Sequence, residues 1–140
     1  MKDRYLYRAK QKGNEEWITG QYVKGLDMYD KEVHLIFEPA TILYSSGETD
    51  GWSEIDPATI CQCTGLKDKN GKLIWENDIM VAHLDEDYPE DETYIRIMWC
   101  GNGFCSIENG SEDITSIDKF DQDHFEVCGN IFDNAELLEE

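Results

Sequence analysis

The chain has 140 residues, a formal net charge of −19 and five cysteines. Its length suits one compact domain or two small lobes, and it contains no apolar run approaching the roughly 20 residues of a membrane span. The opening residues, Met1-Lys2-Asp3-Arg4, lack the apolar stretch of a secretory signal, so we expect a cytoplasmic protein.

The negative charge is concentrated in the second half of the chain. Residues 1–75 hold 10 basic and 12 acidic side chains, a balance of −2, whereas residues 76–140 hold 2 basic and 19 acidic side chains, a balance of −17. Such a field repels phosphate backbones, which argues against direct binding of nucleic acid. A basic protein is the natural partner for it.

Alternation of β-forming residues predicts strands along most of the chain. It begins with Tyr5, Tyr7 and Ala9 and returns in residues 17–23, 33–37, 42–44, 79–84 and 94–99. Between these runs lie turn-forming segments rich in Gly, Asn, Asp and Ser. The sequence therefore predicts a mostly β fold with minor α content, built as small twisted sheets or a partly open β-barrel.

Two hairpins are predicted from their turns. Asn70-Gly71 has the two residues that a type I′ turn needs, and Gly101-Asn102-Gly103 joins the run at 94–100 to the run at 104–107. Helix is expected only as one turn with Asp56 as N-cap and Pro57 at the first position, and as a short C-terminal turn after residues 133–134. The acidic residues 85–92 predict a solvated loop.

Three segments carry a resemblance to a known family. They are Tyr7-Arg8-Ala9-Lys10 with Glu16-Trp17-Ile18-Thr19-Gly20, then the central run from Ile55 to Gly71, and finally Phe125-Glu126-Val127-Cys128-Gly129-Asn130. Together they resemble the YopX-like phage and prophage proteins along nearly the whole chain. The resemblance implies a single YopX-like domain over 1–140, formed as one body or as two lobes, residues 1–63 and a barrel-like 64–140. It implies a phage context and no known reaction.

The chain departs from the family pattern at three positions. Cys61 and Asn77 stand where the family has glycine, and Cys128 replaces an aliphatic residue. Asn tolerates the left-handed conformation better than most residues, so we expect the turn at Glu76-Asn77-Asp78 to be kept.

Cysteine spacing argues against a metal centre. Cys61 and Cys63 are two apart and Cys100 and Cys105 five apart, so neither pair fits the Cys-x-x-Cys spacing of a zinc site. We expect reduced thiols that pack as small apolar residues, with no disulfide framework. The acidic loop lacks the spacing of a calcium loop, and no cofactor is predicted.

No catalytic residue can be assigned from the sequence. The histidines are His34, His83 and His124, of which His34 and His83 are expected to be structural or half-exposed rather than bases. No nucleophile elbow, phosphate loop or metalloprotease helix occurs. The four tryptophans, Trp17, Trp52, Trp75 and Trp99, lie in or beside predicted strands and are expected in the core. Lys67, Lys69 and Lys72 are expected to be solvated at the Asn70-Gly71 hairpin.

These observations favour a non-enzymatic phage-derived accessory protein that binds a protein partner or assembles with itself. Strands without helices to cover them leave sheet edges, and pairing of edges between subunits is one way to remove them. Two alternatives stay open. One is an acidic mimic of DNA that inhibits a nucleic-acid-binding protein, and the other is an enzyme with a carboxylate-lined site.

Overall fold

The computed structural model describes residues 5–38 and 52–138, so the strand expected at 42–44 lies outside the described residues. The chain divides into two compact units, Met1–Cys63 and Thr64–Glu140, here called unit 1 and unit 2. Over the described ranges the fold is mostly β, as predicted, with two open antiparallel sheets and a single short α-helix. No helix among those residues is long and apolar enough to cross a membrane.

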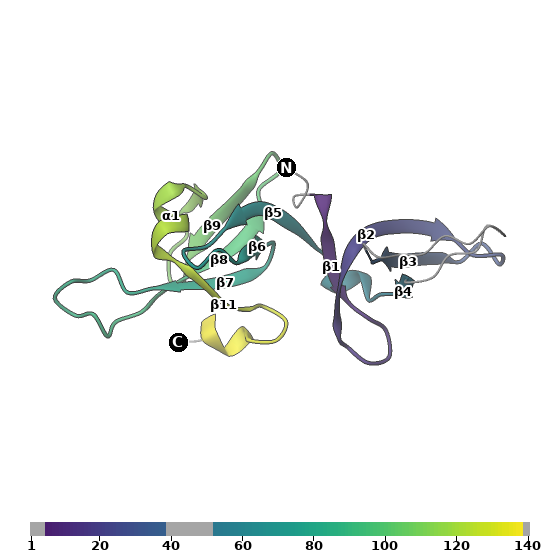
Figure 1. The fold of residues 1–140 in the computed structure, drawn as a ribbon, viewed down its shortest axis with the longest axis horizontal. Coiled ribbons are helices and arrows are strands. Elements are labelled where there is room, and N and C mark those ends of the chain that lie inside the picture. Colours follow the sequence, from purple (N-terminus) through teal and green to yellow (C-terminus); the bar gives the residue numbers. More distant parts are fainter. Residues whose placement is uncertain (1–4, 39–51, 139–140) are drawn as a thin grey trace. The chain divides into compact units, whose positions relative to one another are not determined.

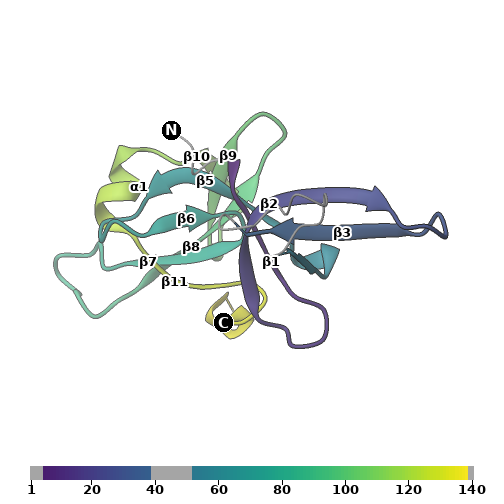
Figure 2. The same ribbon diagram turned by 45° about the vertical axis from the view of Figure 1, so that its right-hand side comes forward.

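Unit 1 contains strands β1 (Tyr7–Lys10), β2 (Trp17–Leu26), β3 (Glu32–Phe37) and β4 (Trp52–Glu54), in the spatial order β4-β3-β2-β1. The long strand β2 pairs with β1 through its first four residues and with β3 through its last six, and β2 and β3 form an extended hairpin (Figures 1 and 2). The core residues are Ala9, Ile18, Ile36 and Ile55.

The helical turn expected at Asp56-Pro57 is confirmed as a 3₁₀ helix, Pro57–Thr59. The Asp56 carboxylate accepts a hydrogen bond from the Ala58 N–H at 3.0 Å, and Pro57 occupies the first position. The Thr59 hydroxyl oxygen in turn accepts from the Lys10 N–H at 2.8 Å, so the turn is fixed to β1.

Strand β5 (Cys61–Lys67) pairs with β1 in its first residues and then continues into unit 2, where β6 (Leu73–Trp75) lies next to it. The second sheet has the order β10-β9-β8-β7-β11. Its strands are β7 (Asp78–Ala82), β8 (Thr93–Trp99), β9 (Phe104–Glu108), β10 (Ile114–Ser116) and β11 (Glu126–Asn130). Helix α1 (Lys119–His124) precedes β11, and a 3₁₀ helix covers Ala135–Leu138.

One face of this second sheet forms the core of unit 2. Its cluster consists of Ile74, Met80, Ala82, Ile95, Ile97 and Phe125. The cross-strand pairs Met80 with Ile95 and Ala82 with Thr93 place these side chains on one face, because opposed residues of antiparallel strands share a face. The acidic segment 85–92 between β7 and β8 is exposed, as expected, and extends beyond the strands as a long loop (Figures 1 and 2).

The hairpin at Asn70-Gly71 is confirmed, but the predicted type I′ turn is wrong. Gly71 has φ +81°, whereas Asn70 is not left-handed. The Gly71 N–H bonds to the Asp68 carbonyl at 3.0 Å and the Asp68 N–H to the Lys72 carbonyl at 2.8 Å, which defines a type I turn followed by a left-handed glycine. The cause is the Asp68 carboxylate, which accepts from the N–H groups of Asn70 and Lys72 and so favours the longer loop.

The conformation expected at Asn77 is confirmed. Its φ is +69°, in the left-handed region, and its side-chain oxygen accepts a hydrogen bond from Arg96 Nη2 at 3.3 Å. The chain therefore keeps the turn between β6 and β7 without the glycine that the family pattern has there.

Candidate functional site

Unit 2 contains a cleft of about 370 Å³, bordered by β8, β9, β10, helix α1 and Leu84 after β7. We call it the unit 2 cleft. Its size lies within the range of sites that hold a small ligand or one side chain of a partner. Eleven residues line it, and they fall into an apolar floor, a group of hydroxyls and a rim of carboxylates.

The floor of the cleft is the outer part of the unit 2 core. Ile95 and Phe125 are only 5% and 3% exposed, and Phe120 and Leu84 border the cleft with more exposed side chains. Phe120 belongs to α1, where its ring stacks on His124. A ligand that enters the cleft therefore meets apolar side chains as well as polar ones.

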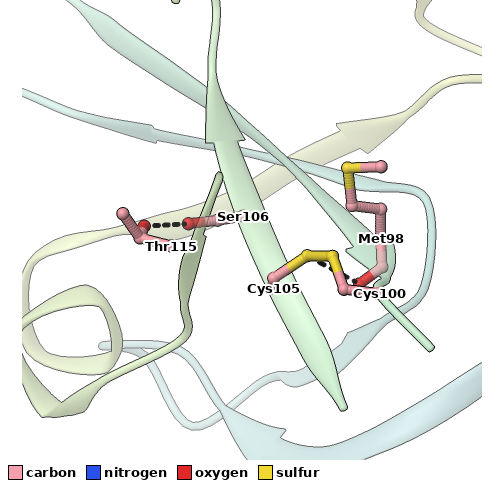
Figure 3. The surroundings of a disulfide bond; sticks show 5 residues. All are labelled: Met98, Cys100, Cys105, Ser106 and Thr115. Atoms are coloured by element: carbon pink, nitrogen blue, oxygen red, sulfur yellow. Dashed lines mark hydrogen bonds between the residues drawn. A yellow bond between two sulfur atoms is a disulfide. The ribbon is translucent and has the colours of Figure 1, made fainter. Parts of the chain in front are cut away.

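Four hydroxyl side chains also line the cleft. The buried Ser106 is opposite Thr115 in the pairing of β9 with β10, and their side-chain oxygens are 3.3 Å apart (Figure 3). Thr93 and Ser111 complete the group. Each hydroxyl can donate one hydrogen bond and accept others, so this part of the cleft can hold either a donor or an acceptor.

Three carboxylates form the rim: Glu108 at the end of β9, Asp113 after the following turn, and Asp121 on α1. The turn is fixed by hydrogen bonds from the Ser111 N–H to the Glu108 carbonyl and from the Asp113 N–H to the Ser111 hydroxyl. None of the lining residues is basic. The cleft therefore has a negative rim above an apolar floor.

Asp121 has a structural role besides lining the cleft. Asp118 and Asp121 form a capping box at the start of α1, in which each side chain accepts from the backbone N–H of the other residue. Burial raises the pKa of the Asp121 carboxyl above its ordinary value, and the Asp118 charge adds to the rise, while the hydrogen bond from the Asp118 backbone opposes it.

The prediction that all five cysteines are reduced and buried is wrong for three of them. Cys100 and Cys105 form a disulfide across the β8–β9 hairpin, with Cα atoms 6.2 Å apart (Figure 3). Cys61 and Cys63 are fully buried, as expected. Cys128 is exposed, yet its sulfur is partly covered and donates to the Ile79 carbonyl at 3.4 Å, and this burial raises the pKa of its thiol.

The three histidines lie outside the cleft lining. His34 hydrogen-bonds the Tyr22 hydroxyl and stacks on its ring. His83 and His124 each have Nδ1 within 3.0 Å of a backbone carbonyl, that of Pro89 and that of Phe120. In the part of the chain that the structure describes, no three His, Cys, Asp or Glu side chains come together as a metal site would require.

The expectation that every tryptophan packs in the core is wrong for three of them, since Trp17 is half-buried and lies outside both core clusters. Trp75 is buried, but Trp52 and Trp99 are 49% and 48% exposed. Trp99 is the last residue of β8 and contacts Phe104 edge to face across the hairpin, which covers only part of its ring. Trp52 begins an edge strand, β4, where one side has no neighbouring strand among the described residues.

The three lysines at the Asn70-Gly71 hairpin are solvated, as predicted. Lys67, Lys69 and Lys72 are exposed around the Asp68–Lys72 turn. The turn also contacts β11, because the Asn70 amide donates to the Glu126 carboxylate and the Val127 N–H donates to Asp68 Oδ2. The hairpin that most resembles the family signature is thus part of the framework of unit 2.

The fold and site define a small, mostly β protein of two open sheets with an acidic cleft. A family model described as YopX protein matches residues 6–139, and the chain therefore belongs to the YopX family. It is similar to the crystal structure of protein EF1440 from Enterococcus faecalis, with 26% identity over 95% of this chain and 96% of that chain and a TM-score of 0.60. No curated protein matches it.

Proposed function

We propose that this chain is a non-enzymatic, phage-derived accessory protein that binds a basic protein through unit 2. Charge is the observation that supports this function. Unit 2 holds 20 acidic and 5 basic residues, a balance of −15, whereas unit 1 holds 11 acidic and 7 basic residues, a balance of −4. A field of this size steers a positively charged partner toward unit 2 and repels nucleic acid.

Unit 2 presents much of this charge to solvent. All residues from His83 to Glu92 are exposed, and six of them are acidic. Glu108 and Asp113 are exposed at the cleft rim, and neither forms an ion pair with a described residue. These side chains are therefore accessible to a basic surface in the fold as it stands.

The test is capture of partners from a host lysate at about 50 and about 500 mM salt, a range over which screening shortens the reach of exposed charges severalfold. We expect basic proteins to be retained at low salt and released at high salt. A variant with the acidic residues of 85–92 replaced by Asn and Gln should retain less. Recovery of no basic protein would contradict the proposal.

Mimicry of DNA is a special case of this function. It requires that the partner's basic surface be its nucleic-acid-binding surface. Duplex DNA should then compete with this chain for the captured protein, and the captured protein should lose its own DNA binding. If the captured protein binds DNA and this chain at the same time, the proposal of a basic partner stands and the proposal of DNA mimicry is wrong.

Self-assembly is a second candidate, favoured by the β2–β3 hairpin of unit 1. Leu26, Met28 and Tyr29 at its tip are 67%, 85% and 82% exposed. The Asp27 carboxylate accepts from the N–H groups of Tyr29 and Lys31, so the tip is held in one conformation with its apolar side chains in water. Light scattering should give more than a monomer mass at micromolar concentration, reduced by Met28→Ser with Tyr29→Ser. A monomeric wild type would exclude self-assembly.

The third candidate is an enzyme with a carboxylate-lined site, and the raised pKa of Asp121 in the cleft is the observation that favours it. The capping box accounts for the burial of that carboxyl without any chemistry. A serine nucleophile would need a base, yet no histidine or lysine lines the cleft. Binding therefore explains the site with fewer assumptions.

A further inference from the structure

We propose that the unit 2 cleft receives an arginine side chain of the basic partner. The inference rests on the proposed function and adds to it the place of contact and the kind of side chain. It follows from three properties of the cleft, namely the apolar side chains of its floor, the carboxylates of its rim and the hydroxyls in its lining.

The apolar floor matches the stem of a long cationic side chain. Ile95 and Phe125 are almost fully buried members of the core cluster, and Leu84 and Phe120 add more exposed apolar surface beside them. The methylene groups of arginine or lysine can cover such a surface while the charged end stays at the rim. A small hydrated cation would leave the floor unused.

The carboxylate rim matches the charged end. Glu108 and Asp113 lie on either side of a turn that backbone hydrogen bonds fix, and no basic residue in the lining neutralises them. An anionic ligand such as a phosphate would meet three carboxylates and no cation. Charge complementarity therefore selects a cation.

Arginine suits this cleft better than lysine. A guanidinium group is planar, donates five N–H bonds and can bind two carboxylates at once, and it loses less hydration on burial than an ammonium group. The exposed Phe120 ring borders the same cleft and offers a surface on which a guanidinium can stack. The Ser106 and Thr115 hydroxyls supply further acceptors for its N–H groups.

The test uses three small probes on the full chain: the capped amides of N-acetyl-arginine, N-acetyl-lysine and N-acetyl-citrulline, the last being the uncharged analogue of arginine. Binding is followed by shifts of backbone amide resonances. We expect saturable shifts at Ile95, Ser106 and Thr115 that are strongest with arginine, weaker with lysine and absent with citrulline. Equal shifts with citrulline, or shifts spread evenly over unit 2, would overturn the inference.

Matched variants separate the cleft from the general field. Glu108→Gln with Asp113→Asn removes two rim charges and should weaken arginine binding about fivefold, the scale of two exposed charge contacts. Glu86→Gln with Asp87→Asn removes two charges from the exposed loop and should change it less than twofold. All four residues are exposed, so both variants should fold.

The outcomes distinguish this inference from the function on which it rests. If both double variants weaken binding equally, or neither does, the cleft is not the site, while the capture of basic proteins by unit 2 stands. If the chain binds no arginine probe but still captures a basic protein, the inference falls alone. If it captures no basic protein either, both fall.

Discussion

Both units have an apolar core packed on a β-sheet, but they differ in the polar side chains that they bury. Among the described residues, the buried polar side chain of unit 1 is Thr59, whereas unit 2 buries two carboxylates, Asp68 and Asp78, at 6% and 1% exposure. The surface hollows of the two units also differ in the charge of their lining. A hollow of about 250 Å³ in unit 1 includes Lys10 and Lys12 in its lining, while the unit 2 cleft has no basic residue.

This difference teaches that the acidity of unit 2 has two separate causes. Asp68 accepts three backbone hydrogen bonds and Asp78 accepts one from the Trp75 N–H at 2.8 Å, so these carboxylates hold turns and strand ends in place. Asp85 in the loop and Asp121 at the cleft rim also accept backbone hydrogen bonds, whereas the side chains of Glu86, Glu108 and Asp113 form no such bond with a described residue. Part of the net charge of −15 in unit 2 therefore belongs to carboxylates that stabilise the fold.

The largest expected effect tests the framework of unit 1. A Cβ at Gly20 would lie 2.0 Å from the Phe37 carbonyl oxygen, a backbone atom that cannot move without disrupting the β2–β3 pairing. We expect Gly20→Val to destabilise unit 1 by about 3 kcal/mol or more, because overpacking against backbone is not relieved by a side-chain rotation. Denaturant unfolding monitored by tryptophan fluorescence measures it.

The control for this prediction lies five residues along the same strand. A Cβ at Gly25 would have no neighbour within 4 Å, and its φ is not left-handed. Gly25→Val should change the free energy of unfolding by no more than about 0.5 kcal/mol, as at an ordinary surface position. If the two substitutions lower the free energy of unfolding by similar amounts, the close approach of the Phe37 backbone to Gly20 is not what requires glycine there.

The second prediction tests the buried carboxylates of unit 2. Asp68→Ala removes the acceptor of the Asn70, Lys72 and Val127 N–H groups and should cost about 2 to 3 kcal/mol, because three partly buried hydrogen bonds to a charged acceptor are lost. Glu86→Ala, in the exposed loop, removes an equal charge and should be nearly neutral. If both variants unfold at the same denaturant concentration, the division between structural and surface carboxylates is wrong.

The third prediction concerns the turn that Asp68 holds. Gly71 has φ +81°, so Gly71→Val should cost about 1 to 3 kcal/mol through backbone strain. Replacing Lys67, Lys69 and Lys72 together by Gln should change stability little, since all three are exposed. Thermal unfolding measures both. A lysine variant that folds normally but loses a partner would show that this hairpin binds as well as supports.

Local features of the fold could be predicted where one or two residues decide the backbone. Asp56-Pro57 starts a helical turn, Asn77 takes the left-handed conformation, and Gly101-Asn102-Gly103 closes a hairpin. Helix α1 was not expected because residues 119–124 contain no apolar period. The spacing of Asp118 and Asp121, which form its capping box, was the available signal.

Features that depend on strand register could not be predicted in the same way. The Cys100–Cys105 disulfide forms because the pairing of β8 with β9 brings the two cysteines together next to the hairpin loop. A separation of five residues in the sequence does not by itself predict this pairing. The unit 2 cleft joins Glu108, Asp113 and Asp121 from a strand, a turn and a helix. Since carboxylates fill this half of the chain, nothing in the sequence separates these three from the rest.

The smallest expected effect is on the pH dependence of stability, and it compares one carboxylate from each unit. In unit 1 the Lys24 ammonium, 2.7 Å from Glu32, lowers the pKa of that carboxyl through a hydrogen bond and charge, while in unit 2 burial raises the pKa of Asp121. A lowered pKa stabilises the fold above the unfolded value, and this contribution is lost as the pH falls through the folded pKa. A raised pKa stabilises the fold below the unfolded value and loses that contribution as the pH rises through the folded pKa.

Glu32→Gln and Asp121→Asn should therefore change the pH dependence of stability in opposite directions. Relative to wild type, Glu32→Gln should lose most near neutral pH and little in acid, whereas Asp121→Asn should lose most in acid and least near neutral pH. Denaturant unfolding from about pH 3 to 7 measures both differences against wild type, across the ordinary carboxyl range. Curves that slope the same way would show that burial does not control the pKa of Asp121, and the contrast between a solvated ion pair in unit 1 and a partly buried helix cap in unit 2 would fail.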